Sequence, residues 1–368
     1  MNPLHELAEV LQRNNEQLGQ YTTNSWQSRT LHAVRKCRTA ELGGHIDQCD
    51  NPNCGHIHLS YNSCRNRHCP KCQGHKREEW ILAREQELLK VPYFHVVFTL
   101  PCELNALCLQ SPKLIYGLLF KTAWSVIKGF GANPKNLGAK MGMIAILHTW
   151  GQNLSLHPHL HCIVPGGGLA ESGRWKYAQR KSKYLFCVKQ MSKVFRAQFV
   201  ADLRKNFTLP PTFYQVLFSK HWVVHCNQPF YGPSQVIEYL ARYTHKIAIS
   251  NHRIKNIENE KVTFSAKDYR KGGKKYDVTL SDQEFIRRFA LHVLPKGFVK
   301  IRHYGFLSSK NKGTLLKELH KRIGKPTIRE KPVLLLNKCR KCKTGDLVTI
   351  YAFDQRGPPC EVLKRIKS

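Results

Sequence analysis

The sequence predicts an α+β chain in which a helical and cysteine-rich N-terminal part precedes a larger domain of strands and helices. Apolar runs rich in β-branched and aromatic residues recur after residue 90 at strand length and are interspersed with helical patterns. Residues 37–77 are rich in Cys, His, Gly and Asn but have few large apolar side chains, so they cannot build a core unaided. The length of 368 residues is enough for two or three domains.

The individual elements follow from the residue patterns. Residues 1–36 are predicted to be helical because apolar side chains recur at helical spacing, at Leu4, Leu7, Val10 and Leu11. Further helices are predicted at residues 77–89, 103–131, 187–206 and 233–248. Strands are predicted at residues 91–101, 141–150, 156–167, 221–228, 261–269 and 274–280.

The charge balance predicts a polyanionic partner. The chain has 59 Lys and Arg against 25 Asp and Glu, a formal net charge of +34. Such an excess destabilises a compact state by self-repulsion unless a polyanion binds, which favours nucleic acid. A ribosome-like structural role and a membrane-surface role are the alternatives. No apolar run approaches the roughly 20 residues of a spanning helix, and residues 1–15 lack the apolar core of a signal peptide.

The cysteine pattern predicts zinc. In a large basic chain without a secretion signal, the 14 cysteines indicate thiols and zinc ligands in a reducing cytoplasm, where a nucleoid-associated protein would work. The pairs Cys49-x4-Cys54 and Cys69-x2-Cys72 match a four-thiolate zinc ribbon, because a short turn presents two thiolates to one ion. Reduced structural cysteines are the alternative. A second site could use the remaining candidates Cys37, His45, Cys64 and His68.

Basic side chains surround this cysteine segment. Arg65, Arg67 and Lys71 are predicted to contact nucleic acid, and Lys76 and Arg77 follow them. The competing interpretation of the neighbouring histidines His45, His56 and His58 is that they are solvated loop residues.

The stretch HPHLHCIVPGGG, residues 157–168, predicts a second kind of metal site. Side chains alternate between the faces of a strand, so His159 and His161 point the same way, as does His157, while Leu160 points to the core. The neighbouring strand ends in HTWGQN, from which Gln152 or His148 could supply a third ligand. Two or three protein ligands leave open positions, which is typical of a catalytic ion. Isolated histidines can also be satisfied polar groups.

Two tyrosines on the helix predicted at residues 233–248 are candidate nucleophiles. Tyr239 and Tyr243 are four residues apart and share one helical face, at the edge of the apolar arc. Aromatic residues at this spacing are also common in cores. Near a metal-bound phosphate, a tyrosine hydroxyl could attack phosphorus, and Arg242, Lys246 or His245 would stabilise the charge.

Taken together, HPHLH, the downstream tyrosine helix, the upstream VVFTLP strand and the CRTAELGGH…SCRNRHCPKC region resemble rolling-circle transposases of the insertion-sequence ninety-one family. These belong to the HUH endonucleases. The resemblance runs from about Leu31 to about Tyr304. It implies an HUH-type central antiparallel sheet, a Mg²⁺ or Mn²⁺ ion on His159 and His161, and Tyr239 and Tyr243 as nucleophile positions. Gln152 is the expected third ligand.

The function expected from this resemblance is a metal-dependent single-stranded DNA endonuclease and strand transferase that forms a 5′-phosphotyrosine intermediate during rolling-circle transposition. The sequence has no GxxxxGK[ST] motif, so a host helicase or replication protein would unwind the strands. A non-catalytic, zinc-dependent nucleic-acid-binding protein is the alternative of another class. A plasmid replication initiator or relaxase would use the same chemistry.

These expectations divide the chain into four consecutive parts. They are a helical segment at 1–36, a zinc-binding DNA-recognition domain at 37–90, an HUH catalytic domain at 91–300 and a basic segment at 301–368. In the last part Cys339 and Cys342 form half a zinc knuckle, which needs a partner from elsewhere. Lys274 and Lys275, near Tyr269 and Tyr276, suit contact with the backbone and bases of a single strand.

Overall fold

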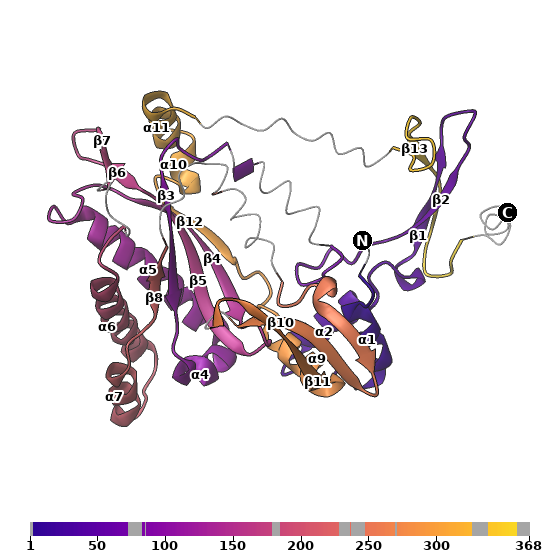
Figure 1. The fold of residues 1–368 in the computed structure, drawn as a ribbon, viewed down its shortest axis with the longest axis horizontal. Helices are drawn as coiled ribbons and strands as arrows, with labels where there is room; N and C mark the ends of the chain where they lie inside the picture. Colours follow the sequence, from indigo (N-terminus) through magenta and orange to yellow (C-terminus); the bar gives the residue numbers. More distant parts are fainter. Residues whose placement is uncertain are drawn as a thin grey trace. The chain divides into compact units, whose positions relative to one another are not determined.

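The computed structural model describes residues 3–72, 83–84, 86–178, 185–227, 236, 247–268, 271–325 and 338–358 (Figure 1). The chain forms two compact units, each assembled from separate segments. The first unit contains Met1–Lys76, Ile249–Val293 and Arg329–Ser368, and the second contains Arg77–Ala248 and Leu294–Ile328. This division differs from the four consecutive parts expected from the sequence, because residues 249–293 and the C-terminal segment group with the N-terminal residues.

The second unit is built on a five-stranded antiparallel sheet, as the sequence predicts. Its strand order is β12-β4-β5-β3-β8, and every neighbouring pair is antiparallel. The bounds are β3 (Tyr93–Thr99), β4 (Gly142–Trp150), β5 (Leu156–Pro165), β8 (Val224–Cys226) and β12 (Ile301–Gly305). The histidine-bearing strand β5 therefore lies at the centre of the sheet, and β8 is shorter than the predicted 221–228.

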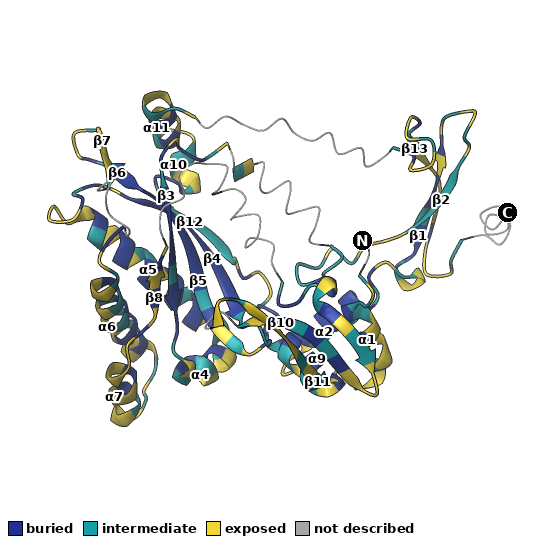
Figure 2. Cartoon of the chain, viewed as in Figure 1, coloured by how far each residue is buried: buried dark blue, intermediate teal, exposed yellow. Residues whose placement is uncertain are grey.

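Helices cover one face of this sheet. They are α4 (Asn105–Gln110), α5 (Pro112–Ala132), α6 (Val188–Asn206) and α7 (Pro211–Ser219), which confirms the helices predicted at 103–131 and 187–206. Alternate residues of β3 and β5 point toward them: Phe94, Val96 and Phe98, and Leu160, Cys162 and Val164. The ring of Phe98 packs edge-on against Phe195 of α6, with centroids 5.0 Å apart. Figure 2 shows β3, β4 and β5 as largely buried strands of this unit.

The opposite face carries a smaller apolar cluster. It contains Tyr93, Ile144, Ile146 and Ile163 from the strands together with Leu316 and Leu319 of α11. Of the helix predicted at 233–248, the structure describes Val236, which is buried in this cluster, and Ile247 and Ala248, which are not helical. Helices α10 (Ser309–Lys312) and α11 (Leu315–Ile323) and the hairpin of β6 (Gly167–Leu169) and β7 (Trp175–Tyr177) complete the described elements of the unit.

The first unit joins the N-terminal helices to a second antiparallel sheet. Helices α1 (Leu7–Arg13) and α2 (Ser25–Arg35) confirm the predicted N-terminal helicity, and α1 contacts α9 (Asp282–Leu291). Arg13 makes a two-point ion pair with the buried carboxylate of Asp282. Strands β9 (Ile254–Glu258), β10 (Lys261–Asp268) and β11 (Lys274–Ser281) form the sheet beside α9.

A third sheet, also in the first unit, pairs the cysteine-rich segment with the C-terminal segment. Its order is β13-β1-β2, with β1 (Gly44–Cys49), β2 (Ile57–Tyr61) and β13 (Leu347–Phe353). Gly44 is required here, because a Cβ atom would lie 2.3 Å from the Ser60 carbonyl oxygen. Strands β1 and β2 form a local hairpin, and β1 also pairs with β13, a strand about 300 residues away in the sequence. Short 3₁₀ turns lie at Asn15–Gln17, Ala40–Leu42, Cys102–Leu104 and Asn251–Arg253. None of the helices among the described residues is long and apolar enough to cross a membrane.

Candidate functional site

Three histidines converge on the face of the five-stranded sheet opposite α5 and α6. His159 and His161 lie on β5, and His148 lies opposite His159 on β4. One ring nitrogen from each histidine lies within 4.8 Å of one from each of the others, and the Nε2 atoms of His159 and His161 are 3.1 Å apart. Two nitrogens bound about 2.1 Å from one ion stand about 3.0–3.4 Å apart. His148 and His161 are buried, whereas His159 is partly exposed, so one side of the cluster is open.

Hydrogen bonds orient His159 for metal binding. Its Nδ1–H donates to the carbonyl oxygen of His157 at 2.6 Å. A carbonyl can only accept, so in the neutral ring the Nε2 atom that faces His161 carries a lone pair. His157 therefore contributes its backbone carbonyl, not its imidazole, to this contact.

A chain of side chains leads from His161 away from the cluster. His95 Nε2 lies 2.9 Å from His161 Nδ1, and the two rings stack. The amide of Asn227 then contacts His95 Nδ1 at 3.0 Å and His225 Nε2 at 2.6 Å. Burial lowers the pKa of His95 to about 3, so its ring is neutral. These contacts were not predicted from the sequence, where the available signal was the imidazole of His95 in the apolar strand VPYFHVVFTLP.

His148 is the residue that joins the predicted histidine pair in this cluster. Its ring stacks on Trp150 and lies edge-on to His161 with a centroid distance of 4.5 Å. Gln152, the predicted third ligand, lies in the turn after β4 and remains a prediction. Three imidazoles suit a first-row transition ion better than Mg²⁺, which prefers oxygen ligands. Of the two expected ions, the donor set therefore favours Mn²⁺.

Tyr239, Arg242, Tyr243 and Lys246 lie outside the described residues, as does Tyr269.

Eight of the described cysteines gather in two groups of four that differ from the predicted grouping. Cys69 and Cys72 lie with Cys37 and Cys64, and we call these four the N-terminal cysteine cluster. Cys49 and Cys54 lie instead with Cys339 and Cys342, and we call these the bridging cysteine cluster. The prediction of one zinc ribbon from Cys49, Cys54, Cys69 and Cys72 is therefore wrong, because the two pairs lie in different clusters. The predicted second set of Cys37, His45, Cys64 and His68 is wrong too, since neither histidine joins a cluster.

Strand pairing is the reason for this regrouping. Cys49 ends β1, and β13 pairs along β1 so that Cys49 lies opposite Leu347, close in sequence to Cys342. Cys37 follows α2, where the Arg38 N–H donates to the Asn62 carbonyl oxygen at 3.0 Å and brings Cys64 alongside. His45 is paired with Asp47 on β1, at a distance of 3.4 Å.

The N-terminal cysteine cluster fits zinc. Sγ of Cys72 lies 3.5 Å from that of Cys37 and 3.7 Å from that of Cys64. Sulfurs bound tetrahedrally at about 2.3 Å from zinc stand about 3.8 Å apart. Backbone N–H groups of Cys64 and Asn66 donate to the sulfurs of Cys37 and Cys64. Such bonds favour the thiolate form that zinc requires.

The basic side chains predicted to contact nucleic acid differ in solvent exposure and in ion pairing. Arg65 is exposed, and its backbone adopts a positive φ of 51°. Arg67 is half-buried, and burial lowers its pKa. Lys71 makes an ion pair of 2.5 Å with Glu6. Lys274 and Lys275 are exposed on β11. Arg65 and the β11 lysines are therefore the predicted contacts whose charges are most open to solvent.

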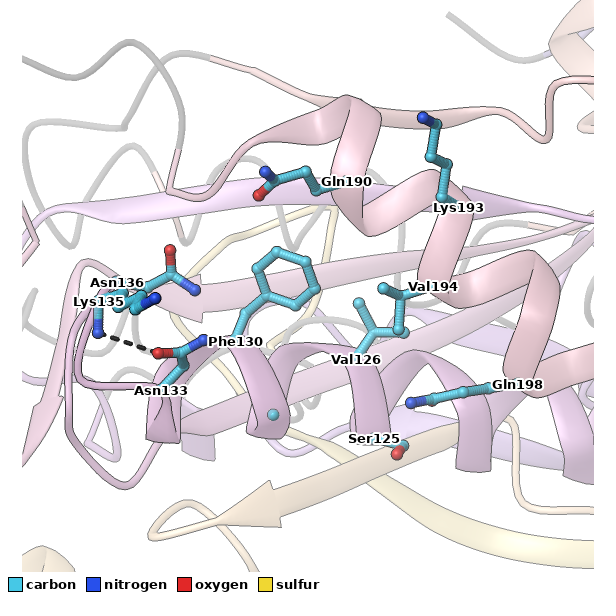
Figure 3. A pocket seen from close by; sticks show the side chains of 11 residues that line it. Ser125, Val126, Phe130, Asn133, Lys135, Asn136, Gln190, Lys193, Val194 and Gln198 are labelled. Carbon is cyan, nitrogen blue, oxygen red and sulfur yellow. Dashed lines mark hydrogen bonds between the residues drawn. The ribbon is translucent and has the colours of Figure 1, made fainter.

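A pocket of about 550 Å³ lies between α5 and α6, on the helix-covered side of the sheet (Figure 3). Val126, Phe130 and Val194 form its apolar wall. The amide of Asn133 accepts from the Lys135 backbone N–H at 2.9 Å at its rim. The histidine cluster is on the other face of the sheet, so the pocket is no part of it.

Comparison with known proteins identifies relatives for most of the chain. The family described as "Transposase zinc-binding domain" matches residues 8–100, and the family described as "Putative transposase" matches residues 142–314. A "Putative transposase" of Sinorhizobium fredii is 40% identical, over 96% of this chain and 97% of its own length. The transposase for insertion sequence element IS801 of Pseudomonas savastanoi pv. phaseolicola is 28% identical, over 79% of this chain and 72% of its own. No solved structure matches the chain significantly.

Proposed function

Since this chain belongs to the insertion-sequence ninety-one family of transposases, with an N-terminal zinc-binding domain, we propose that it cuts and rejoins single-stranded DNA through a 5′-phosphotyrosine intermediate. Such an enzyme would carry out rolling-circle transposition. The observation that carries the proposal is the histidine cluster on a central strand of an antiparallel sheet. The His-Leu-His order on β5 is the arrangement expected of an HUH endonuclease.

His148, His159 and His161 would hold the divalent ion, with Gln152 as a further candidate ligand. A bound ion would polarise a phosphoryl oxygen of the scissile phosphodiester. The chain's own part is to present the lone pair of His159 Nε2, through the bond from Nδ1–H to the His157 carbonyl, and to bury His148 and His161. The open side next to His159 leaves room for the DNA backbone.

Tyr239 and Tyr243 are the proposed nucleophiles. The attacking hydroxyl loses its proton, its oxygen forms a bond to phosphorus, and the bond to the 3′ oxygen breaks, leaving a free 3′-hydroxyl. Arg242 and Lys246 would stabilise the negative charge. Val236, three residues before Tyr239, is buried in the apolar cluster on the histidine-bearing face, which supports a place for this helix beside the histidines.

The remaining parts of the proposal concern partners. The N-terminal cysteine cluster would hold a structural zinc ion in the domain that recognises the element's end. Unwinding would fall to a host helicase or replication protein. The net charge of +34 supports a nucleic-acid substrate for the whole chain.

A labelled single-stranded oligonucleotide that spans an element end, incubated with the protein and Mn²⁺, tests the chemistry on a denaturing gel. We expect a covalent adduct at protein mass with wild type and with the control Tyr177→Phe, an exposed tyrosine on β7. The adduct should disappear in the double variant Tyr239→Phe, Tyr243→Phe.

The double variant His159→Ala, His161→Ala should lose cleavage but keep oligonucleotide binding in a fluorescence anisotropy titration, because the basic surface is unchanged. An adduct that survives the tyrosine double variant would refute the nucleophile assignment. Equal cleavage by wild type and the histidine double variant would refute the metal site. Binding without cleavage under any divalent ion would favour a non-catalytic DNA-binding protein.

A further inference from the structure

Four cysteines from the two ends of the chain form the bridging cysteine cluster. The Sγ atoms of Cys49 and Cys342 are 3.6 Å apart, and those of Cys54 and Cys339 are 3.8 Å apart. All four sulfurs lie within 4.8 Å of one another. Four thiolates at about 2.3 Å from a tetrahedral zinc ion would be separated by about 3.8 Å. The spacing is therefore that of a complete zinc ligand set.

The two loops that present these sulfurs approach each other closely at Gly345. The Gly345 N–H donates to the Cys342 sulfur at 3.3 Å. A Cβ atom on Gly345 would lie 2.5 Å from the Cys49 sulfur, so only glycine fits this position. A backbone N–H that donates to a sulfur favours the thiolate, which is the form that binds zinc.

Backbone bonds dock one loop onto the other. The Asp50 N–H donates to the Asp346 carbonyl oxygen at 2.9 Å, and the Asp346 N–H donates to the Asp50 carboxylate at 2.7 Å. Within the C-terminal loop, the Cys339 N–H donates to the Gly345 carbonyl oxygen at 2.9 Å. The loops therefore meet as a two-part knuckle, with one half from each end of the chain.

Little apolar burial holds the C-terminal strand in place. Along β13 only Phe353 is buried, whereas Val348, Ile350 and Tyr351 are 43–52% exposed. A strand that buries so little apolar surface depends for its stability on hydrogen bonds and on further links at its ends. Small units of this kind are commonly stabilised by a structural metal.

We propose that Cys49, Cys54, Cys339 and Cys342 bind a second structural zinc ion, and that this ion attaches the C-terminal segment to the zinc-binding domain. The family match to the zinc-binding domain ends at residue 100, so it contains only two of the four ligands. The domain is therefore completed by residues about 290 positions later in the chain. This proposal does not depend on the tyrosine chemistry.

Zinc content of the purified full-length protein, measured by mass spectrometry against protein concentration, tests the proposal. The background is His159→Ala, His161→Ala, so that the histidine cluster takes up no zinc. We expect two zinc ions per chain. Cys339→Ser, Cys342→Ser should leave one, as should Cys37→Ser, Cys64→Ser. The matched control Cys102→Ser, Cys187→Ser removes two exposed cysteines outside both clusters and should leave two.

Hydrogen exchange of the Cys339→Ser, Cys342→Ser variant provides a second readout. We expect the amides of β13 to exchange about tenfold faster or more, while those of α1 and α9 keep their protection, which shows that the unit is still folded. One zinc ion per chain before any cysteine is replaced, or two after Cys339 and Cys342 are replaced, would overturn the proposal. An unchanged exchange rate in β13 would overturn the anchoring role.

Discussion

His161 has two ring nitrogens with different tasks, and the protons around it decide whether it can bind an ion. In the structure the Asn227 Nδ2 atom faces His95 Nδ1, so the amide donates there and His95 carries its proton on Nε2. His95 then donates to His161 Nδ1, and His161 carries its own proton on Nε2, directed at His159. To bind an ion through Nε2, His161 must instead carry its proton on Nδ1, so that Nε2 has a lone pair. These proton positions follow from the hydrogen-bonding capacity of each partner.

Replacing Asn227 with an aspartate should favour the metal-binding tautomer. A carboxylate can only accept, so His95 would hold its proton on Nδ1 and accept at Nε2 from His161 Nδ1–H. We expect Asn227→Asp to bind Mn²⁺ more tightly than wild type in calorimetry, because the hydrogen bond to His161 Nδ1–H then fixes the tautomer that the ion requires.

The negative charge that Asn227→Asp introduces could also attract the ion, so the tautomer is measured directly. Long-range ¹⁵N–¹H couplings in the metal-free protein should show the His161 proton on Nε2 in wild type and on Nδ1 in Asn227→Asp. If the His161 proton is already on Nδ1 in wild type, the proton positions assigned to His95 and His161 are wrong, whatever the affinities are.

At the scale of elements, the ion pair between α1 and the start of α9 secures the first unit. Asp282 is buried and accepts two bonds from Arg13 and one from the Asn14 amide at 2.8 Å. Its loss leaves these donors facing a buried, apolar methyl group. The pair joins residues about 270 positions apart, so it stabilises the long-range packing of the two helices.

We therefore expect Asp282→Ala to lower the free energy of unfolding of the first unit by about 1–3 kcal/mol. Exchange of the slowest amides in α1 and α9 measures this free energy. The control is Asp277→Ala, whose ion pair with Lys255 has both side chains about half exposed and should contribute less than about 1 kcal/mol. Equal losses in the two variants would contradict a special role for the buried pair.

The strands and long helices around the histidine cluster could be predicted from the sequence, because each has its own periodicity. Strands β3, β4 and β5 were apparent from short β-branched runs, and α5 and α6 from longer apolar patterns. Strand β13 was not predicted, since its exposed apolar residues give no alternation and its partner β1 is far away in the sequence. Helix α9 was also missed, in a segment where the pattern of short strands was stronger.

At the scale of the molecule, positive charge is the dominant property. A net charge of +34 makes DNA binding strongly dependent on salt, because each phosphate contact releases counterions. Lys274 and Lys275 are exposed on β11, beside Tyr276. They remain the predicted phosphate contacts on this strand.

Lys274→Ala, Lys275→Ala should reduce the slope of log affinity against log salt by about 1.4, since each phosphate contact contributes about 0.7 for single strands. Binding to a labelled single strand at several salt concentrations measures this slope. The control is Lys121→Ala, Lys205→Ala, which removes the same charge from two lysines already paired with Asp202. A slope that falls equally in both variants would mean that total charge, not contact at β11, sets the salt dependence.

The sequence by itself determined the properties that arise within short stretches. The alternation of a strand places His159 and His161 on one face, the Cys-x2-Cys and Cys-x4-Cys spacings present pairs of thiolates, and the composition sets the charge. Only the tertiary structure decided which pairs meet. All thiols look alike in a sequence, so the assignment of Cys49 and Cys54 to Cys339 and Cys342 depended on the register of β1 with β13. The addition of His148, and the contact of His95 with His161, likewise depended on which strands lie side by side in the sheet.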